Sequence, residues 1–351
     1  MDPVRPDLEQ VPAEVRAYIE WLEAELARST EKRKAVPATP STTPGEMDEP
    51  PTTANIITIS HGGLIKRTPR HFYGRQRRGG MGVFDLESPE EDAPAVLAHG
   101  DEKDILLLLT DQGRSFRLPL SAIPASPVRA RGQALADLLP MRQQERMVAA
   151  LAEGSGQYVI LFTQRGWVRR VRATYLGQSL IPGTSFHDLK EGGPLVAACS
   201  SRGDEDVFLA TREGKGIRFA ETQIPARGCL GIRLDVTDAG VAVAAVRPDS
   251  GVFLLGQDGM GTVRLMSGFS ANKSPGAGGK VVMKTSQLVG AATAGPQEEI
   301  FIISRLGKII RFLADEIPAK EGVVQGVNCL SLRSDEAVAM VVTATGTSAN
   351  G

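Results

Sequence analysis

A cluster of arginines and glycines near residue 75 is the part of the sequence best suited to bind an anion. Residues 75–82 read RQRRGGMG and contain no acidic side chain. Arginine can donate two parallel hydrogen bonds to a phosphate group, and glycine lets backbone N–H groups come close to it. No aromatic residue lies in the segment, so stacking on bases is not expected there. The segment is a candidate phosphate-binding loop, and an ordinary solvated loop is the alternative.

Motifs for catalysis and for metal binding are missing from the sequence. The histidines are scattered and form no HExxH pair or His–Cys cluster (His61, His71, His99 and His187). The run SPGAGGKVV at 274–282 lacks the first glycine of a P-loop and the Ser or Thr that follows its lysine. No GxSxG motif with an evident base is present. We therefore predict a non-enzymatic protein that needs no metal and no cofactor.

The cysteines and the hydropathy argue against export and against insertion in a membrane. Cys199, Cys229 and Cys329 are far apart and form no CxxC pair, which fits a reducing cytosol. The N-terminus has no apolar signal segment, and no run approaches 18 apolar residues. We expect a cytoplasmic protein, associated with the nucleoid if it binds DNA.

The charge is divided unevenly along the chain. The formal net charge is -1, but residues 1–54 carry 6 Lys/Arg against 11 Asp/Glu, which leaves 34 basic and 30 acidic residues after position 54. The net negative charge of the N-terminal part therefore offsets a mildly positive net charge in the rest of the chain. A polyanionic partner is compatible with this distribution.

The first 54 residues and the last eight differ in character from the rest. Residues 1–30 form a head in which 12–28 have the apolar spacing of one amphipathic helix. Such a helix packs on its own protein, self-associates or binds a partner helix. Residues 31–54 contain five prolines and five threonines, as is typical of a linker, and 344–351 are expected to be a flexible tail.

Residues 55–343 contain six repeats of about 48 residues. Each repeat opens with a short apolar run and a glycine, and a second glycine follows 17 to 20 residues later. The first glycines are Gly63, Gly113, Gly166, Gly214, Gly259 and Gly307, and the second are Gly82, Gly132, Gly183, Gly231, Gly279 and Gly326. Apolar β-branched runs that end at a glycine indicate β-hairpins. Six of them predict an all-β fold, a six-bladed propeller-like closed array.

An arginine recurs four residues after the first glycine in five of the six repeats. These residues are Arg67, Arg117, Arg170, Arg218 and Arg311, while the fifth repeat has Val263 and then Arg264. The flanking positions are largely apolar, so the arginines should lie on the opposite face of the strand. Either each arginine pairs with a carboxylate of an adjoining strand, or together they form a ring of cations for a long polyanion. Lys66, Arg70, Arg75 and Arg169 add positive charge nearby.

The repeats resemble the C-terminal β-pinwheel of the bacterial DNA gyrase A protein. SHGGLIKRTPRHFYGRQRRGGMG, TDQGRSFRLPLSAIP and RGCLGIRLD carry the likeness, which covers about residues 55–343 and all six blades. In that family a motif of the first blade, the gyrase A box, reads QRRGGKG. Residues 76–82 read QRRGGMG here, so six of seven positions match. The related topoisomerase IV pinwheel typically lacks an intact box, which makes gyrase the closer relative.

The resemblance implies a stand-alone pinwheel that bends or wraps duplex DNA around its outer perimeter with little sequence specificity. The box would fix one end of the wrapped segment. The expected DNA contacts are Gln76, Arg77, Arg78, Gly79, Gly80 and Gly82 of the box, with Lys66, Arg67, Arg70, Arg75, Arg117, Arg169, Arg170, Arg218 and Arg311. No counterpart of the gyrase cleavage domain or its tyrosine is expected in this chain. A type II topoisomerase is a candidate partner of the N-terminal helix.

Two departures from the family pattern favour a second interpretation. Met81 replaces the lysine of the box, and the acidic segment ESPEED follows at 87–92. In the alternative, the pinwheel is a protein-interaction module that docks on a topoisomerase or another partner, and DNA contact is secondary. In either case we expect the Gly-rich box loop to contribute little to folding.

Overall fold

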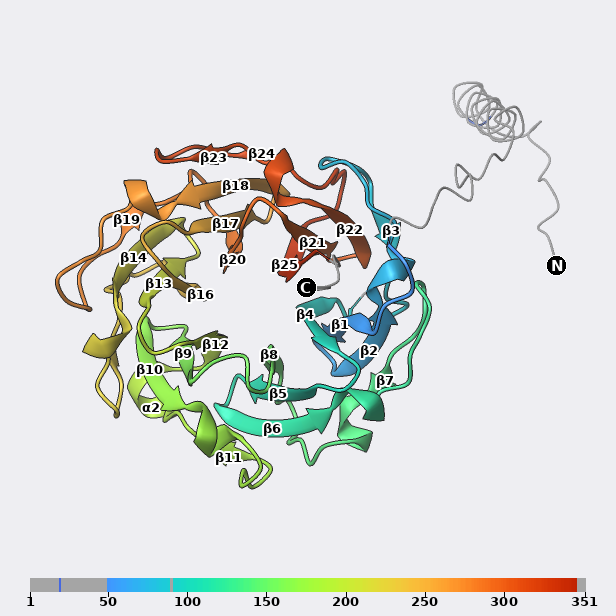
Figure 1. The fold of residues 1–351 in the computed structure, drawn as a ribbon, viewed down its shortest axis with the longest axis horizontal. Helices are drawn as coiled ribbons and strands as arrows, with labels where there is room; N and C mark the ends of the chain where they lie inside the picture. Colours follow the sequence, from blue (N-terminus) through green and yellow to red (C-terminus); the bar gives the residue numbers. More distant parts are fainter. Residues whose placement is uncertain (1–18, 20–48, 89–90, 346–351) are drawn as a thin grey trace, which may run out of the picture. The chain divides into compact units, whose positions relative to one another are not determined.

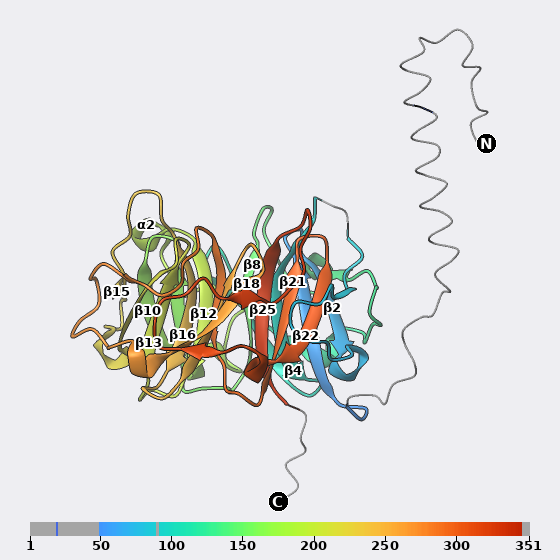
Figure 2. The ribbon, with the colours of Figure 1, turned by 90° about the horizontal axis from the view of Figure 1, so that it is seen from above.

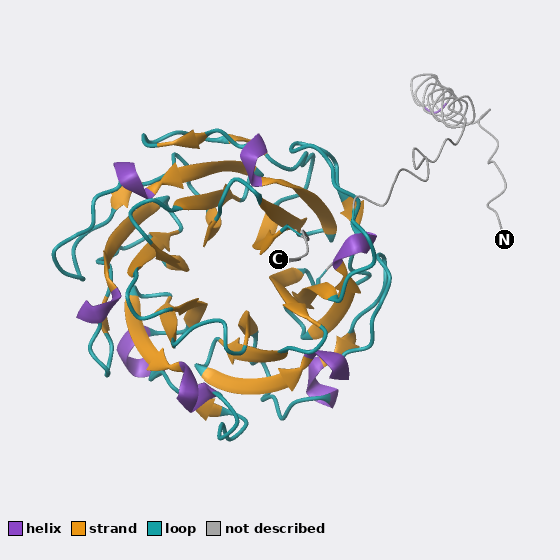
Figure 3. Cartoon of the chain, viewed as in Figure 1, coloured by secondary structure: helices purple, strands orange, loops and turns teal. Residues whose placement is uncertain are grey.

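The six repeats form a closed ring of six β-sheets, which confirms the predicted propeller. The computed structural model describes Ile19 and residues 49–88 and 91–345. The predicted helix at 12–28 lies outside these residues apart from Ile19, and so does most of the predicted linker. Figure 1 shows the sheets arranged like blades around a central axis, and Figure 3 shows that strands and loops account for most of the ring.

Each blade is a sheet of mostly antiparallel strands that follow one another from the centre of the ring to its edge. In this order blade 1 holds β4 (Pro94–Asp101), β1 (Ala54–Ser60), β2 (Leu64–Pro69) and β7 (Gln133–Ala134). Blade 2 holds β8 (Met147–Ala152), β5 (Ile105–Thr110), β6 (Arg114–Pro119) and β11 (Thr184–Ser185). Blade 3 holds β12 (Leu195–Ser201), β9 (Tyr158–Thr163), β10 (Trp167–Arg172) and β15 (Cys229–Leu230).

The other three blades follow the same plan. Blade 4 holds β16 (Gly240–Val246), β13 (Asp206–Thr211), β14 (Lys215–Ala220) and β19 (Lys280–Val281). Blade 5 holds β20 (Leu288–Thr293), β17 (Gly251–Gly256), β18 (Met260–Leu265) and two short outer strands, β23 (Ala319–Lys320), which runs parallel to β18, and β24 (Val327–Asn328). Blade 6 holds β25 (Ala337–Ala344), β21 (Glu298–Ser304), β22 (Lys308–Leu313) and β3 (Val83–Phe84).

The outer strand of every blade comes from the next repeat along the chain. β7, for example, belongs to the second repeat but pairs with β2 of the first. The exchange also closes the ring, because β3 of the first repeat pairs with β22 of the last, through Val83 with Ile309 and Phe84 with Lys308. The outer strands therefore lie at the perimeter, where Figure 1 shows β7, β11, β19 and β23.

Short helical turns join the second strand of each repeat to its outer strand. They are the 3-10 helices η1 (Arg70–Phe72), η2 (Leu120–Ala122), η4 (Ala173–Leu176), η5 (Glu221–Gln223), η6 (Met266–Gly268) and η7 (Ala314–Glu316). Two further turns are η3 (Leu135–Asp137) and α2 (Leu189–Gly192). The buried apolar residue that ends most of these turns, such as Ile123 or Ile224, anchors the outer segment to the blade.

The hydrophobic core lies between neighbouring blades. Ile57 of blade 1 packs with Leu108 and Phe116 of blade 2 in one buried cluster, and Phe253 of blade 5 packs with Ile302 of blade 6 in another. Both faces of each sheet are therefore covered by protein, as the neighbouring blades in Figure 1 illustrate. Figure 2 shows the ring edge-on, with the strands of the blades upright. The inner strands surround a cavity of about 410 Å³ lined mainly by alanine and valine.

The propeller begins earlier in the chain than the sequence predicts. The described residues from Glu49 onward form one compact unit with the propeller, whereas the repeats start at position 55. Glu49, placed in the linker by its composition, is only 6% exposed. At least this end of the predicted linker is part of the folded ring.

Candidate nucleic-acid interface

The box segment joins the two ends of the propeller sequence. Its backbone is held by the last repeat, because the Gln76 N–H donates to the carbonyl of Arg311 at 2.8 Å and the Gly79 N–H to that of Cys329 at 2.8 Å. In return, the Ser331 N–H donates to the carbonyl of Gly80 at 2.9 Å. The box segment, residues 75–82, thus connects the first repeat to the last, and we call this connection the clasp.

The glycines of the box are required by this clasp. Gly79 and Gly82 have φ of +77° and +67°, values that L-residues with a side chain rarely adopt. A Cβ at Gly82 would lie 2.6 Å from the carbonyl oxygen of Ile309. The N–H groups of Gly80 and Gly82 donate to the carbonyl of Arg77 and to Gln76 Oε1. These amides have protein partners, so the expectation that the glycines exist to bring amides to phosphate is not supported.

The three arginines around the box differ in what they can bind. The Arg78 Nε donates to the carbonyl of Glu316 at 2.8 Å, and its backbone N–H donates to the Glu316 carboxylate at 2.8 Å. Arg75 pairs with the buried Glu299, with 2.7 Å between Nη2 and Oε1. Arg77 is exposed, and its guanidinium has no hydrogen bond or ion pair within the described residues. Met81, also in this loop, is 61% exposed.

Three of the five recurring arginines, Arg67, Arg218 and Arg311, face the next blade and not the solvent. Arg67 Nε donates to the carbonyl of Ile123 at 2.8 Å, at the end of the 3-10 helix of blade 2. Arg218 of blade 4 reaches the equivalent residue of blade 5, with 3.1 Å from Nη1 to the carbonyl of Phe269. Arg311 of blade 6 does the same to blade 1 across the ring closure. Each of the three arginines is at most 9% exposed.

The expectation that these positions form an exposed ring of cations is therefore wrong, and the alternative of pairing within the protein is the correct one. Arg117 lies 2.8 Å from the Glu153 carboxylate, and Arg170 lies over the ring of Tyr158. Arg169 Nη1 donates to the carbonyl of Phe186 at 2.6 Å. The physical reason is that in a propeller both faces of a sheet abut other blades. Alternation along a strand moves a side chain from one such face to the other, but never to the perimeter.

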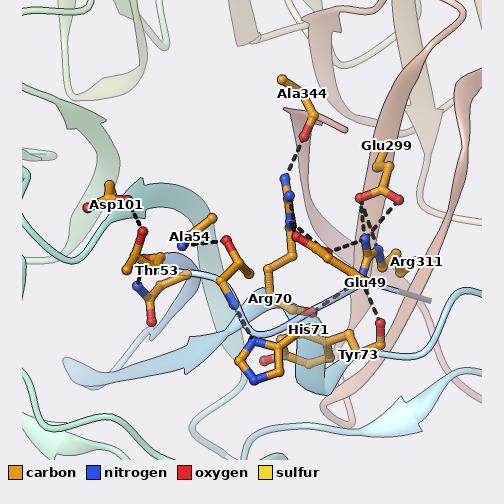
Figure 4. A network of polar contacts seen from close by, with 12 residues as sticks. Glu49, Thr53, Ala54, Arg70, His71, Tyr73, Asp101, Glu299, Arg311 and Ala344 are labelled. Atoms are coloured by element: carbon orange, nitrogen blue, oxygen red, sulfur yellow. Dashed lines mark hydrogen bonds and ion pairs between the residues drawn. The ribbon is translucent and has the colours of Figure 1, made fainter. Parts of the chain in front are cut away.

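Arg70 and Arg311 share a buried network with two carboxylates (Figure 4). The Glu49 carboxylate lies 2.5 Å from Arg70 Nη2 and 2.7 Å from Arg311 Nη2, and Glu299 lies 2.7 Å from Arg311. Burial alone would raise the pKa of Glu49, but the hydrogen bonds and charges of the two arginines outweigh it, so its pKa is lowered. The positive charge of both arginines is neutralised inside the protein.

Lys66 is also part of the interior, contrary to the prediction that it adds to a basic surface. Its side chain is fully buried, and its Nζ lies 2.5 Å from Asp85 Oδ1. The Tyr73 hydroxyl donates to the same carboxylate at 2.6 Å, and the Thr58 hydroxyl donates at 2.9 Å. Burial lowers the pKa of the Lys66 ammonium, opposed by the charge of Asp85. Lys66 therefore stabilises the ring beside the box and is not accessible to a phosphate.

The exposed cations of the perimeter lie in the segments that carry the outer strands. They are Arg129 and Arg131 beside β7, Arg227 and Arg233 beside β15, Lys273, Lys280 and Lys284 beside β19, and Lys320 in β23. The sequence reasoning missed them because it followed the first glycine of each repeat. The second glycine of a repeat is a better guide to the exposed cations, since Arg131 is next to Gly132 and Lys280 is next to Gly279.

The described residues contain no group of three or more His, Cys, Asp or Glu placed to hold a metal ion. None of the helices in the described part of the chain is long and apolar enough to cross a membrane.

Six sheets with an outer strand exchanged between neighbours define a β-pinwheel. The family model described as "DNA gyrase C-terminal domain, beta-propeller" matches residues 54–90, 104–150, 205–248 and 298–343. The propeller is therefore a β-pinwheel of the DNA gyrase A C-terminal type, as its sequence predicts.

Curated relatives agree with this assignment. The chain is 29% identical over 295 residues to the DNA gyrase A protein of Escherichia coli K12, which covers 81% of this chain and 34% of that protein. It is 29% identical over 338 residues to the gyrase A protein of Pseudomonas aeruginosa, covering 80% of this chain and 36% of that one. The chain thus spans about a third of the length of these relatives.

Two solved structures have the same fold. A DNA gyrase A C-terminal domain superposes with a TM-score of 0.73 at 19% identity, covering 82% of this chain and 99% of that one. The C-terminal domain of DNA topoisomerase IV gives 0.59 at 18% identity, with 84% and 94% covered.

Proposed function

We propose that this protein binds duplex DNA without catalysing a reaction on it, and that it bends or wraps the duplex around the outer edge of the pinwheel. The observation that carries the proposal is the row of exposed cations beside the outer strands. The matching family, a gyrase C-terminal domain, is consistent with a role in DNA topology. We place the protein in the cytoplasm, associated with the nucleoid, and a type II topoisomerase is the candidate partner of the N-terminal helix.

The contacts with DNA come from the edge of the ring. Arg77 is retained from the box as a direct phosphate ligand because its guanidinium is exposed. Arg75 and Arg78 extend the positive potential but already have protein partners. The outer segments around β7, β15 and β19 supply the remaining cations. Such contacts need charge and spacing but read no base edge, so little sequence specificity is expected.

The proposal is tested by DNA titration at several salt concentrations together with topology trapping. Four or more phosphate contacts give a slope of about -4 or steeper in log K against log salt. Relaxing a closed circle with the protein bound should trap a change in linking number. A slope near -1, with no trapped linking number, would overturn the proposal.

A matched pair of double variants locates the contacts. Lys273→Gln with Lys280→Gln, on the segment of β19, should reduce the slope by about 2. The control is Arg146→Gln with Arg165→Gln, which removes two exposed cations that lie before β8 and in the β9–β10 turn, away from the outer edge. The control pair should leave the slope unchanged if DNA follows the edge.

One observation favours the second candidate, a protein-docking pinwheel. Met81, Val83 and Phe84 are 61%, 43% and 43% exposed and lie close together in the chain at the ring closure. Phe84 also has the cations of Lys308 and Arg129 over its ring at 5.5 and 5.7 Å. An apolar patch edged by cations suits a protein partner that is both apolar and acidic.

A further inference from the structure

The cations of the outer edge are not evenly spread around the ring, and the outer segment of blade 2 has none. This segment, residues 176–185, reads LGQSLIPGTS and contains no charged residue. It carries β11 and exposes Ile181, at 74%, close to Tyr175 in the chain, at 61%. The two flanking blades have Arg129 and Arg131 near β7, and Arg227 and Arg233 near β15.

The charged groups behind this segment do not replace the missing cations. Arg114 lies against Gly183, but its guanidinium pairs with the buried Glu145 at 2.6 Å. Arg169 is held by the carbonyls of Phe186 and Ala226. In sequence the nearest exposed cations, Arg172 and Lys190, lie beyond the two ends of the segment, and Lys190 stands between Asp188 and Glu191.

The remaining five outer segments follow one another around the ring, and each of them carries at least one exposed cation. From blade 3 to blade 4 the edge carries Arg227, Arg233, Lys273, Lys280 and Lys284. Blade 5 adds no net charge, because Lys320 is next to Glu321, and blade 6 presents the box. Blade 1 completes the path with Arg129 and Arg131.

We infer that the DNA path is open at blade 2, so that a bound duplex follows the edge from blade 3 through blades 4, 5 and 6 to blade 1 and leaves the ring on either side of β11. This inference rests on the proposed function. A duplex gains affinity where phosphates meet exposed cations, and a long neutral segment with exposed apolar side chains offers no such gain for the bending that contact would require. The ends of the wrapped segment are thereby fixed by the protein.

The proposed path is tested by replacing one exposed serine at a time with glutamate, which adds a negative charge at a chosen point of the outer edge. Ser179→Glu places the charge in the outer segment of blade 2, and Ser274→Glu places it beside Lys273 in blade 4; both serines are exposed. Losing one phosphate contact costs about eightfold in affinity at 0.1 M salt, because each contact contributes a slope of about -0.9. We therefore expect Ser274→Glu to weaken duplex binding about eightfold and Ser179→Glu to change it less than twofold.

The outcomes separate this inference from the proposed function. If Ser179→Glu weakens binding as much as Ser274→Glu, DNA crosses blade 2 and the open path is wrong, while edge binding stands. If neither variant weakens binding, the edge is not the DNA site and the proposed function fails as well. Gln178→Glu and Ser270→Glu form a second pair in the same two segments and should repeat the result. Thermal unfolding of each variant checks that the ring is intact.

Discussion

Neutralising Glu49 should destabilise the ring, because this carboxylate balances two buried guanidiniums. In the Glu49→Gln variant, Arg70 would lose the carboxylate with which it pairs, and Arg311 would keep only Glu299. Removing one partner of a buried ion pair typically costs about 3–5 kcal/mol, and glutamine keeps some hydrogen bonds, so we expect about 3 kcal/mol. In a domain of this size 1 kcal/mol corresponds to about 2 °C, which gives a decrease in Tm of about 6 °C.

The assay is thermal or urea unfolding of the full chain, with an exposed ion pair as the control. Asp204→Asn removes a carboxylate that is 73% exposed and 3.7 Å from Arg247. Such a pair contributes about 0–1 kcal/mol, so this variant should unfold almost like the wild type. Equal stability of the wild type and Glu49→Gln would refute the stabilising role of Glu49 and would agree with its prediction as a linker residue.

The pH dependence provides a second check on Glu49. Its pKa in the folded protein is lowered from its usual value of 4.5. A group with a lowered pKa stabilises the folded state above its unfolded pKa and loses this contribution as the pH falls through the folded pKa. The stability difference between the wild type and Glu49→Gln should therefore be complete at neutral pH and shrink below about pH 4.5. A difference that grew on acidification would contradict the assignment.

Three further predictions concern the box. Arg77→Ala should weaken DNA binding and reduce the salt slope by about 1 without changing Tm, whereas Arg78→Ala should lower the unfolding free energy by about 1–2 kcal/mol, because its guanidinium holds the last repeat. Equal Tm values for the two variants would show that the clasp does not stabilise the ring. Gly82→Ala should cost about 2–4 kcal/mol in urea unfolding, since alanine would adopt a φ of +67° and meet a backbone oxygen; wild-type stability would rule out the close contact. Met81→Lys should steepen the salt slope by about one unit, while weaker binding of a protein partner with unchanged DNA affinity would favour the docking alternative.

The sequence predicts that the box loop contributes little to folding, whereas the contacts of the loop with the last repeat predict that some box variants lower the stability. The prediction from the sequence treats the loop as a polar surface segment, and the hydrogen bonds of Gly79 and Arg78 to the last repeat are absent from that description. A contact between residues 79 and 329 arises only when the ring closes. Sequence reasoning on the loop alone sees its composition and not its partner.

The repeat of apolar runs and glycines was enough to predict the propeller. Positions such as Gly63, at φ +85°, and Gly214, at φ +73°, are tight turns whose geometry favours glycine in any setting, so they leave a periodic trace in the sequence. The apolar runs between them are buried strands, as at Ile57 and Leu108. The turn glycines and the apolar runs can be recognised within each short segment of the sequence. Their sixfold recurrence was therefore enough to predict the fold class and the number of blades.

The direction of each charged side chain was decided only by the tertiary structure. Arg218 and Arg311 occupy strand positions that alternate with apolar residues, which in a single sheet would put them in solvent. In the ring a second sheet covers that face, so these arginines bind carbonyls of the next blade and the exposed cations are those near the outer strands. The exchange of outer strands and the burial of Glu49 likewise join residues far apart in the chain. No local pattern encodes such contacts, because they depend on which blade lies beside which when the six repeats close.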